Sequence, residues 1–156
     1  MGGRVTAGTP VLTVVDTREL GLLAEVDETV TLTRLSPGDY TVLAERNGFS
    51  GCMAADHFQP WVPRQGQAPF VWNVLTAVGE RTAGDLGPGV TCPSFRWHPA
   101  MVAQASATLA TMYPDRHWLG LGSGEALNEH VVAGYWPEAP QRIAMMFEAI
   151  EVIRKL

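Results

Sequence analysis

Four short groups of polar and glycine residues hold the side chains of this chain that could do chemistry. An imidazole, a carboxyl group and an indole around one pocket form a set suited to general acid–base catalysis. His57, Glu125 and Trp61 supply these groups, and we take them as candidate catalytic residues. The four groups are Asp56-His57 with Trp61, Thr91-Cys92-Pro93, Gly122-Ser123-Gly124-Glu125, and Asn128.

Each candidate also has a plainer structural interpretation. His57 would be a histidine of a surface loop, although an acid and two aromatic residues crowd it. Glu125 would lie near the start of a helix and interact with the helix dipole. Trp61 would be an apolar plug over the strand ends. We favour a functional role for His57 and Glu125, and both interpretations of Trp61 stay open.

The glycine-rich run Gly120-Leu121-Gly122-Ser123-Gly124-Glu125 invites comparison with a dinucleotide-binding loop. It follows a predicted strand and opens a predicted helix, as that fingerprint requires. However, Glu125 takes the place of the last glycine, and no acid follows at a strand end about 20 residues later. We therefore do not expect a Rossmann site. The glycines still leave backbone N–H groups exposed, which suits the polar edge of a cofactor.

A metal site is a weaker possibility. Asp56, His57, His98 and Glu125 could be imagined as ligands, but the chain has neither His-x-x-x-His nor Cys-x-x-Cys spacing. His98 precedes Pro99, a pattern typical of a helix start, so we interpret it as a cap. The sequence predicts no metal ligands.

Alternating strand and helix patterns position these groups. Strands are predicted to start near residues 49, 87 and 117, and the intervening lengths suit βαβ units with parallel strands. The carboxyl ends of parallel strands lie on one side of a sheet, so the four groups should converge. Helices are predicted over 36–46, 69–82, 98–112, 126–132 and 141–156. Their predicted apolar faces are Phe70, Val74, Ala77 and Val78; Val102, Ala105, Leu109 and Met112; and Ile143, Phe147, Ile150 and Ile153.

Two α/β architectures fit this order: a doubly wound open sheet, and part of a (β/α)8 barrel. A full TIM barrel needs about 250 residues, whereas this chain has 156. We predict a partial (β/α)8 TIM barrel of about four βα units over 36–156. Residues 1–35 form a divergent, unassigned segment, in which 10–16 and 28–33 resemble strands and 17–26 a short helix.

Composition excludes several classes of protein. The net charge of −5 gives no reason to expect nucleic acid or an anionic membrane as a partner. Cys52 and Cys92 lie in apolar segments. We interpret them as small hydrophobic residues of a protein from a reducing compartment. No apolar run approaches the roughly 20 residues of a membrane span. There is no basic-then-apolar signal layout, so we expect a cytoplasmic protein.

Several motifs resemble the luciferase-like monooxygenase superfamily, nearest to its coenzyme F420-dependent glucose-6-phosphate dehydrogenase group. The resemblance covers about residues 36–156, and its motifs recur in order. They are Ala55-Asp56-His57-Phe58-Gln59-Pro60-Trp61, Val78-Gly79-Glu80-Arg81-Thr82, Cys92-Pro93-Ser94-Phe95-Arg96-Trp97-His98-Pro99-Ala100, Val102-Ala103-Gln104-Ala105 and Leu119-Gly120-Leu121-Gly122-Ser123-Gly124-Glu125-Ala126-Leu127-Asn128-Glu129.

This resemblance implies a TIM barrel whose carboxyl-terminal mouth holds F420 or, in some relatives, FMN. His57 would lie beside the reactive ring, Trp61 would pack on the substrate side, and Glu125 would be the acid–base glutamate. Gly89-Val90 falls where the family has a bulge with a non-prolyl cis peptide bond. Cys92 stands where the glucose-6-phosphate enzyme has threonine, which weakens a hydrogen bond to the cofactor. The implied cofactor-binding residues are Asp56, Gly89, Val90, Cys92, Ser123, Gly124 and Asn128.

The resemblance implies hydride transfer between F420, or alternatively FMN, and a small organic substrate, carried out by a fragment of a longer enzyme. The family's sugar-phosphate lysine and arginine lie in the second half of its barrel, so the substrate is not fixed here. A half-barrel leaves unpaired sheet edges, so we expect a homodimer or association with a complementary half-barrel. The alternative is a catalytically incompetent truncated barrel that serves as a remnant or assembly subunit.

Overall fold

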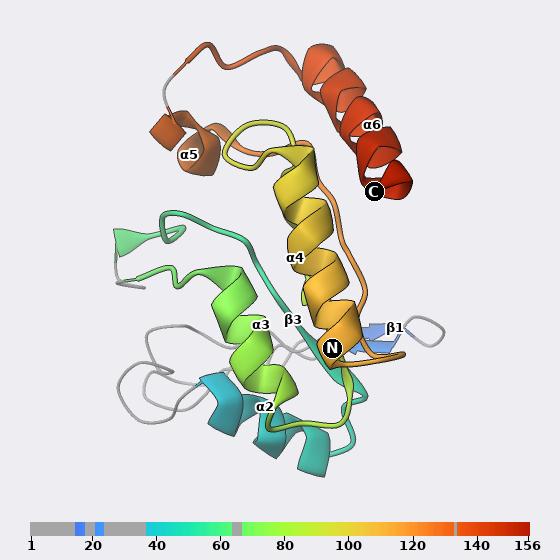
Figure 1. Cartoon of the computed structure of the whole chain (residues 1–156). Helices are drawn as coiled ribbons and strands as arrows, with labels where there is room; N and C mark the ends of the chain where they lie inside the picture. The colour runs from blue at the N-terminus through green and yellow to red at the C-terminus, as the bar shows by residue number, and fades with distance from the viewer. Residues whose placement is uncertain (1–14, 18–20, 24–36, 64–66, 133) are drawn as a thin grey trace.

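The computed structural model describes residues 15–17, 21–23, 37–63, 67–132 and 134–156 (Figure 1). These residues form short strands that alternate with helices. In chain order they are β1 (Val15–Thr17), β2 (Gly21–Leu23), α2 (Pro37–Arg46), β3 (Gly51–Ala54), α3 (Val71–Gly79), β4 (Asp85–Pro88), α4 (Pro99–Met112), α5 (Ala126–Glu129), the 3-10 helix η2 (His130–Val132) and α6 (Ala139–Lys155).

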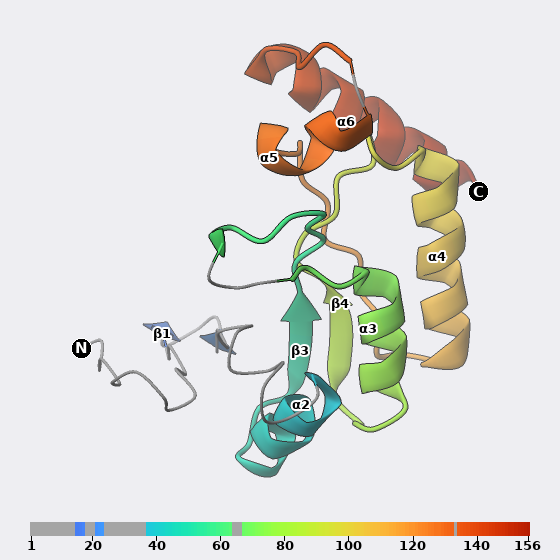
Figure 2. The ribbon, with the colours of Figure 1, turned by 90° about the vertical axis from the view of Figure 1, so that its left-hand side faces the viewer.

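A parallel sheet organises the region that carries the candidate residues. β3 and β4 pair in parallel, with Cys52 opposite Leu86 and Ala54 opposite Pro88. Residues 117–121 lie along the far side of β4 through two parallel bridges, Leu86 to His117 and Thr91 to Leu121. Figure 2 shows β3 and β4 side by side with α3 and α4 on one side of them. The predicted α/β class with parallel strands is therefore confirmed.

Local sequence signals fix several helix ends where they were predicted. α2 starts at Pro37, and Gly48, with φ of +91°, follows its end in a conformation that favours glycine. Before α4, the Nδ1 atom of His98 accepts a hydrogen bond from the Ala100 N–H at 3.1 Å. Pro99 occupies the first turn of α4. His98 is thus a helix cap, as the sequence indicated.

The core lies between the sheet and the helices α3 and α4. Buried Val71, Trp72 and Leu75 of α3 meet Leu86 of β4, and Cys52 packs against this cluster. The predicted apolar face of α3 is confirmed at Val78, whereas Val74 is half-buried and Phe70 is exposed. The reason is that Phe70 is the extended N-cap residue and lies outside the helical period; it packs edge-on against Trp97 instead, with ring centroids 5.3 Å apart. Ala77 of the predicted face is exposed.

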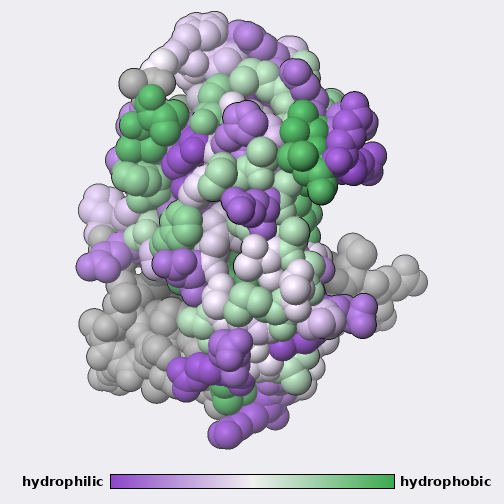
Figure 3. Space-filling model, viewed as in Figure 1, coloured by the Kyte–Doolittle hydropathy of each residue, from purple (hydrophilic) through white to green (hydrophobic). Residues whose placement is uncertain are grey.

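Helices α4 and α6 depart in part from their predicted faces. Val102 and Leu109 of α4 are buried and Ala105 packs against the core, but Met112 is exposed. In α6, Ile153 packs against the core, whereas Ile143 and Phe147 are exposed. The reason is that α6 packs against α4 rather than on the sheet. Figure 3 shows apolar side chains at the surface over α6 and near α5.

The amino-terminal segment differs from its prediction where it is described. β1 and β2 pair in antiparallel fashion, with Val15 opposite Leu23. The short helix predicted over 17–26 is therefore wrong at 21–23, which is the strand β2. The predicted strand over 10–16 overlaps β1, and the predicted strand over 28–33 lies outside the described residues.

A polar clamp closes the end of the sheet opposite the candidate site. Arg116 donates hydrogen bonds to the carbonyl oxygens of Gly84 (2.9 Å) and Gly79 (3.2 Å). The Tyr113 hydroxyl donates to the Thr76 carbonyl oxygen at 2.7 Å, and its ring lies against Gly79. A Cβ atom on Gly79 would lie 2.4 Å from that ring. Only glycine fits here without displacing the tyrosine.

We predict that Gly79→Ala destabilises the fold by about 1–3 kcal/mol, because the added methyl group overpacks the Tyr113 ring. Helix propensity alone predicts the opposite sign, since alanine is favoured over glycine by about 1 kcal/mol. Denaturant unfolding of Gly79→Ala, Tyr113→Leu and the double variant measures the effect. The penalty of Gly79→Ala should shrink in the Tyr113→Leu background, and additive effects would contradict this packing.

Candidate active site

The carboxyl ends of three parallel segments meet through backbone hydrogen bonds. The Asp56 N–H donates to the Val90 carbonyl oxygen at 3.3 Å, which joins the loop after β3 to the loop after β4. The N–H of Thr91 donates to the Gly120 carbonyl oxygen at 3.0 Å, and the N–H of Gly122 to the Thr91 carbonyl oxygen at 2.9 Å. The convergence of the predicted groups at one edge of the sheet is confirmed.

The peptide bond between Gly89 and Val90 is cis, as the family resemblance implied. It directly follows β4 and presents the Val90 side chain, which is 49% exposed. A Cβ atom at Gly122 would lie 2.6 Å from a methyl group of Val90. The glycine in the third segment therefore leaves room for this half-exposed valine at the mouth of the sheet.

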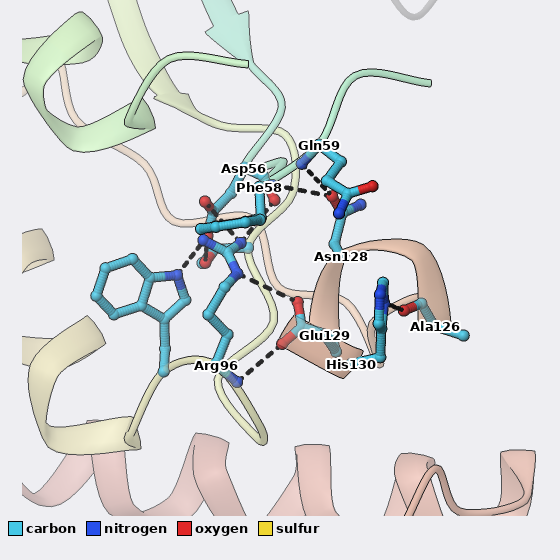
Figure 4. A network of polar contacts seen from close by, with 10 residues as sticks. Asp56, Phe58, Gln59, Arg96, Ala126, Asn128, Glu129 and His130 are labelled. Carbon is cyan, nitrogen blue, oxygen red and sulfur yellow. Dashed lines mark hydrogen bonds and ion pairs between the residues drawn. The ribbon is translucent and has the colours of Figure 1, made fainter. Parts of the chain in front are cut away.

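The carboxylate of Asp56 is enclosed by protein groups (Figure 4). Its side chain is 1% exposed, and Arg96 Nη2 lies 2.9 Å from Oδ1. Oδ2 accepts hydrogen bonds from the Trp97 indole N–H (2.7 Å) and from the Thr91 hydroxyl. Both oxygens are thus used inside the protein. The contact of Asp56 with a cofactor stays a prediction. In the structure its carboxylate binds other protein side chains instead.

Arg96 and Glu129 are central to the site, and the sequence interpretation gave neither of them a role. Their side chains are 9% and 2% exposed, with Arg96 Nε 3.7 Å from Glu129 Oε1. The backbone N–H of Arg96 donates to Glu129 Oε2 at 2.8 Å. Burial raises the pKa of Glu129, while the backbone hydrogen bond and the charge of Arg96 oppose this rise. One signal in the sequence could have revealed the role of Arg96: it is a charged residue that stands between the aromatic residues Phe95 and Trp97.

Asn128 holds the loop that carries His57. Its side-chain oxygen accepts hydrogen bonds from the N–H groups of Phe58 (2.9 Å) and Gln59 (3.2 Å), and the residue is 3% exposed. The prediction made Asn128 a cofactor-binding amide. That contact stays a prediction, whereas the carbonyl oxygen of the amide already binds the protein backbone.

The three predicted catalytic side chains occupy the open side of this edge. His57 is half-buried, and its ring centroid lies 5.2 Å from that of Trp61, which is 59% exposed. Glu125 is exposed and is the N-cap residue of α5. Burial lowers the pKa of His57, the carboxylates of Glu125 and Asp56 oppose this shift, and Arg96 adds to it. The imidazole and the Glu125 carboxylate are therefore close enough to interact.

Cys92 and Gly124 pack tightly against each other at the same edge. Gly124 has φ of +81°, and a Cβ atom on it would lie 2.7 Å from the Cys92 sulfur. Burial raises the pKa of the Cys92 thiol to about 11, so the thiol is protonated at neutral pH. Ser123 is half-buried beside them. Cofactor contacts from Cys92, Ser123 and Gly124 stay predictions, as do those from Gly89 and Val90.

The described part of the chain holds neither a group of metal ligands nor a membrane-spanning helix. Among those residues, no three His, Cys, Asp or Glu side chains are grouped so that they could hold a metal ion. None of the described helices is long and apolar enough to cross a membrane.

We predict that Glu125→Gln lowers the pKa of His57 further, because it removes a negative charge that stabilises the imidazolium ion. Titration of the His57 ring protons by NMR measures this shift. Glu138→Gln, an exposed N-cap carboxylate at the start of α6, is the matched control and should leave His57 unchanged. An unaltered or higher pKa in Glu125→Gln would contradict the proximity of the two groups.

Burial of His57 also predicts a pH dependence of stability. Because its folded-state pKa lies below the ordinary value of 6.5, the unfolded chain takes up its proton first as the pH falls. The stability contribution of His57 is therefore present above pH 6.5 and is lost as the pH falls through the folded-state pKa. Denaturant unfolding at about pH 7.5 and about pH 5, which lie on either side of the ordinary histidine pKa, should show a smaller loss of stability in His57→Gln than in the wild-type chain. An identical slope in both proteins would contradict this assignment.

Comparisons with known proteins agree with this geometry. The chain is 49% identical over 120 residues to an F420-dependent glucose-6-phosphate dehydrogenase of Segniliparus rotundus, covering 76% of this chain and 36% of that protein. It is 50% identical over 118 residues to such an enzyme of Rhodococcus jostii, covering 74% of this chain and 35% of the relative. The chain thus spans about a third of the length of these curated relatives.

Solved structures and a family model give the same result. An F420-dependent secondary alcohol dehydrogenase in complex with an F420–acetone adduct matches with a TM-score of 0.75 and 38% identity, covering 80% of this chain and 39% of that one. A type II Baeyer–Villiger monooxygenase of Pseudomonas putida, at 19% identity and a TM-score of 0.62, covering 75% of this chain and 32% of that one, shares the fold. The luciferase-like monooxygenase model matches residues 27–156. The chain belongs to the luciferase-like monooxygenase family.

Proposed function

We propose that this chain is part of an oxidoreductase that uses coenzyme F420 to transfer a hydride to or from a small organic substrate. The observation that carries the proposal is the setting of half-buried His57. Its ring contacts Trp61, its pKa is influenced by the charge of Glu125, and its neighbour Asp56 is hydrogen-bonded to Val90 of the cis peptide bond Gly89-Val90. The relatives at about 50% identity are named F420-dependent dehydrogenases, which supports the choice of cofactor. FMN presents a similar flat ring system and is the second candidate.

The residues at this edge fit a flat ring with a polar rim. Val90 and Trp61 expose apolar surface, at 49% and 59% respectively, on which a ring system can pack. His57 and Glu125 provide polar groups beside that surface. A Cβ atom at Gly122 would fill space next to Val90, so the glycine keeps this approach open. A cofactor site usually combines a mostly apolar surface with a few polar groups.

Each side chain has a distinct task in this proposal. F420, when bound, supplies the ring carbon that accepts or donates the hydride. The lowered pKa of His57 keeps its imidazole neutral at neutral pH, which lets it accept a proton. Glu125 lies within electrostatic reach of His57 and can relay that proton or stabilise the imidazolium ion. Trp61 covers His57 and limits the access of water.

The relatives suggest the class of substrate. One group is named for glucose 6-phosphate, and the solved structure is of a secondary alcohol dehydrogenase. Both names describe oxidation of a carbon that carries a hydrogen atom and a hydroxyl group. We therefore infer a substrate of this H–C–OH type, whose hydroxyl proton passes to His57 or Glu125 as the hydride leaves.

We also propose that residues 36–156 form the first half of a (β/α)8 barrel. Helices α3 and α4 pack on one face of β3–β4, whereas Met53 and Trp118 on the other face are 49% and 38% exposed. The Trp118 ring lies over Gly87 and Met53 lies beside Gly89, so this inner face is apolar. A second copy of the chain or a complementary half-barrel would cover it. An assembly subunit without activity is the alternative function that this exposed face favours.

We predict that the chain binds F420 at micromolar concentration, detected as a change in cofactor fluorescence. His57→Ala and Glu125→Ala should lower the rate of hydride transfer by about 100-fold or more, since proton transfer by a positioned side chain contributes 10²–10⁴-fold. Both variants should largely retain binding of the cofactor. Parallel titration with FMN separates the two cofactors.

Glu138→Ala is the matched control, because Glu138, like Glu125, is an exposed N-cap residue, here at the start of α6. Size-exclusion chromatography of the same samples, with and without cofactor, reports whether the inner face is covered by a second copy. Absence of binding by F420 and FMN alike would refute the oxidoreductase proposal and leave the assembly subunit. Full activity of His57→Ala or Glu125→Ala would refute their roles.

A further inference from the structure

We propose that Arg96 and Glu129 are positioning residues that fasten the loop 56–59 at both ends and thereby fix His57 at the mouth of the sheet. The inference rests on the proposed function in so far as His57 acts on a cofactor. Neither residue belongs to the predicted catalytic set. Figure 4 shows the contacts that link the two ends of the loop.

The first fastening is at Asp56. Arg96 Nη2 lies 2.9 Å from Asp56 Oδ1 and also donates to the Asp56 backbone oxygen at 2.9 Å. Trp97 and Thr91 donate to the other carboxylate oxygen. Backbone and side chain of Asp56 are therefore held together, and the residue that follows is His57. Its Cα position is limited by this arrangement.

The second fastening is at Phe58 and Gln59. The side-chain oxygen of Asn128 accepts hydrogen bonds from both of their N–H groups. Asn128 lies on α5, a helix of only four residues that has little stability of its own. The adjacent Glu129 is bonded to the backbone N–H of Arg96 at 2.8 Å. Glu129 thus secures the helix that places Asn128.

Arg96 links the two fastenings to each other. It joins Asp56, at the start of the loop, to Glu129, beside the group that holds the end of the loop. His57 is the residue between the two fastenings, and its own ring contacts Trp61. A guanidinium group can serve two acceptors in a fixed planar geometry, whereas a lysine ammonium acts as a point charge on a flexible stem. In this site Nη2 serves two oxygens of Asp56, while Nε lies 3.7 Å from Glu129 Oε1, and we expect a lysine not to reproduce both contacts.

A purely stabilising role is the competing explanation. Buried ion pairs are weak evidence for net stability, because desolvation of the charges offsets their attraction. Here Arg96 Nε is buried without a hydrogen-bond partner at 3.7 Å from Glu129 Oε1, and burial raises the pKa of Glu129. The arrangement is thus better suited to fixing geometry than to adding stability. The two roles differ in what happens locally at Phe58 and Gln59 when Arg96 is replaced.

Hydrogen exchange of individual amides tests this difference. The variants are Arg96→Met, which removes the charge, and Arg96→Lys, which keeps the charge but loses the planar fork. Arg154→Met on α6 is the matched control, because Arg154 forms an exposed pair with Glu151. Exchange is measured at Phe58 and Gln59 and, as an internal reference, at the amides of Val102 and Leu109 in the core of α4.

Both Arg96 variants should lose protection at Phe58 and Gln59 by at least about tenfold more than at Val102 and Leu109. Arg154→Met should match the wild-type chain. Equal loss at all four amides would show a global effect and overturn the proposal. Wild-type protection at Phe58 and Gln59 in Arg96→Lys, the milder variant, would overturn it as well.

Kinetics provides a second readout on a cofactor-binding preparation. Misplacement of His57 should lower single-turnover hydride transfer in Arg96→Lys by about 100-fold, with a much smaller change in cofactor affinity. An unchanged transfer rate would overturn the positioning role. The exchange experiment needs no cofactor, so failure of the wild-type chain to bind F420 or FMN would refute the proposed function without altering the exchange result.

Discussion

A guanidinium group buried between two carboxyl groups is the constraint on which the mouth of this sheet depends. Charges taken out of water are costly unless they are paired and hydrogen-bonded. Asp56, Arg96 and Glu129 come from three successive strand-to-helix segments, and their side chains are at most 9% exposed. None of these segments can move alone without leaving a buried charge unpaired. In the positioning role that we propose, this coupling fixes the half-buried His57.

Local signals in the sequence were sufficient for part of the site. The starts of α2 and α4, the parallel strands and the convergence of His57, Trp61 and Glu125 follow from helix caps and from the geometry of parallel sheets. The cis peptide bond at Gly89-Val90 came from the family resemblance. The family resemblance did not predict the ion pairs of Arg96. Its partners, Glu129 and Asp56, lie 33 and 40 residues away in the sequence, so the pairs leave no periodic pattern.

The helix faces show a second limit of sequence interpretation. Helices α3 and α6 each carry apolar residues on more than one face. Which face is buried therefore depends on the element that packs against the helix. In α3 the neighbour is the sheet, which selects Trp72 and Leu75; in α6 it is α4, which leaves Phe147 exposed. The exposed inner face of the sheet and the exposed part of α6 are consistent with the half-barrel that we propose.

The central claim is that the three strand ends form one cofactor-binding edge. An NMR titration of the labelled chain with F420 tests it most directly, by following backbone amide shifts. The account predicts that the amides of 56–59, 61, 90–92 and 123–128 shift together and saturate at one cofactor concentration, while those of α6 remain unchanged. Absence of shifts, or shifts centred on the exposed face of α6, would contradict it.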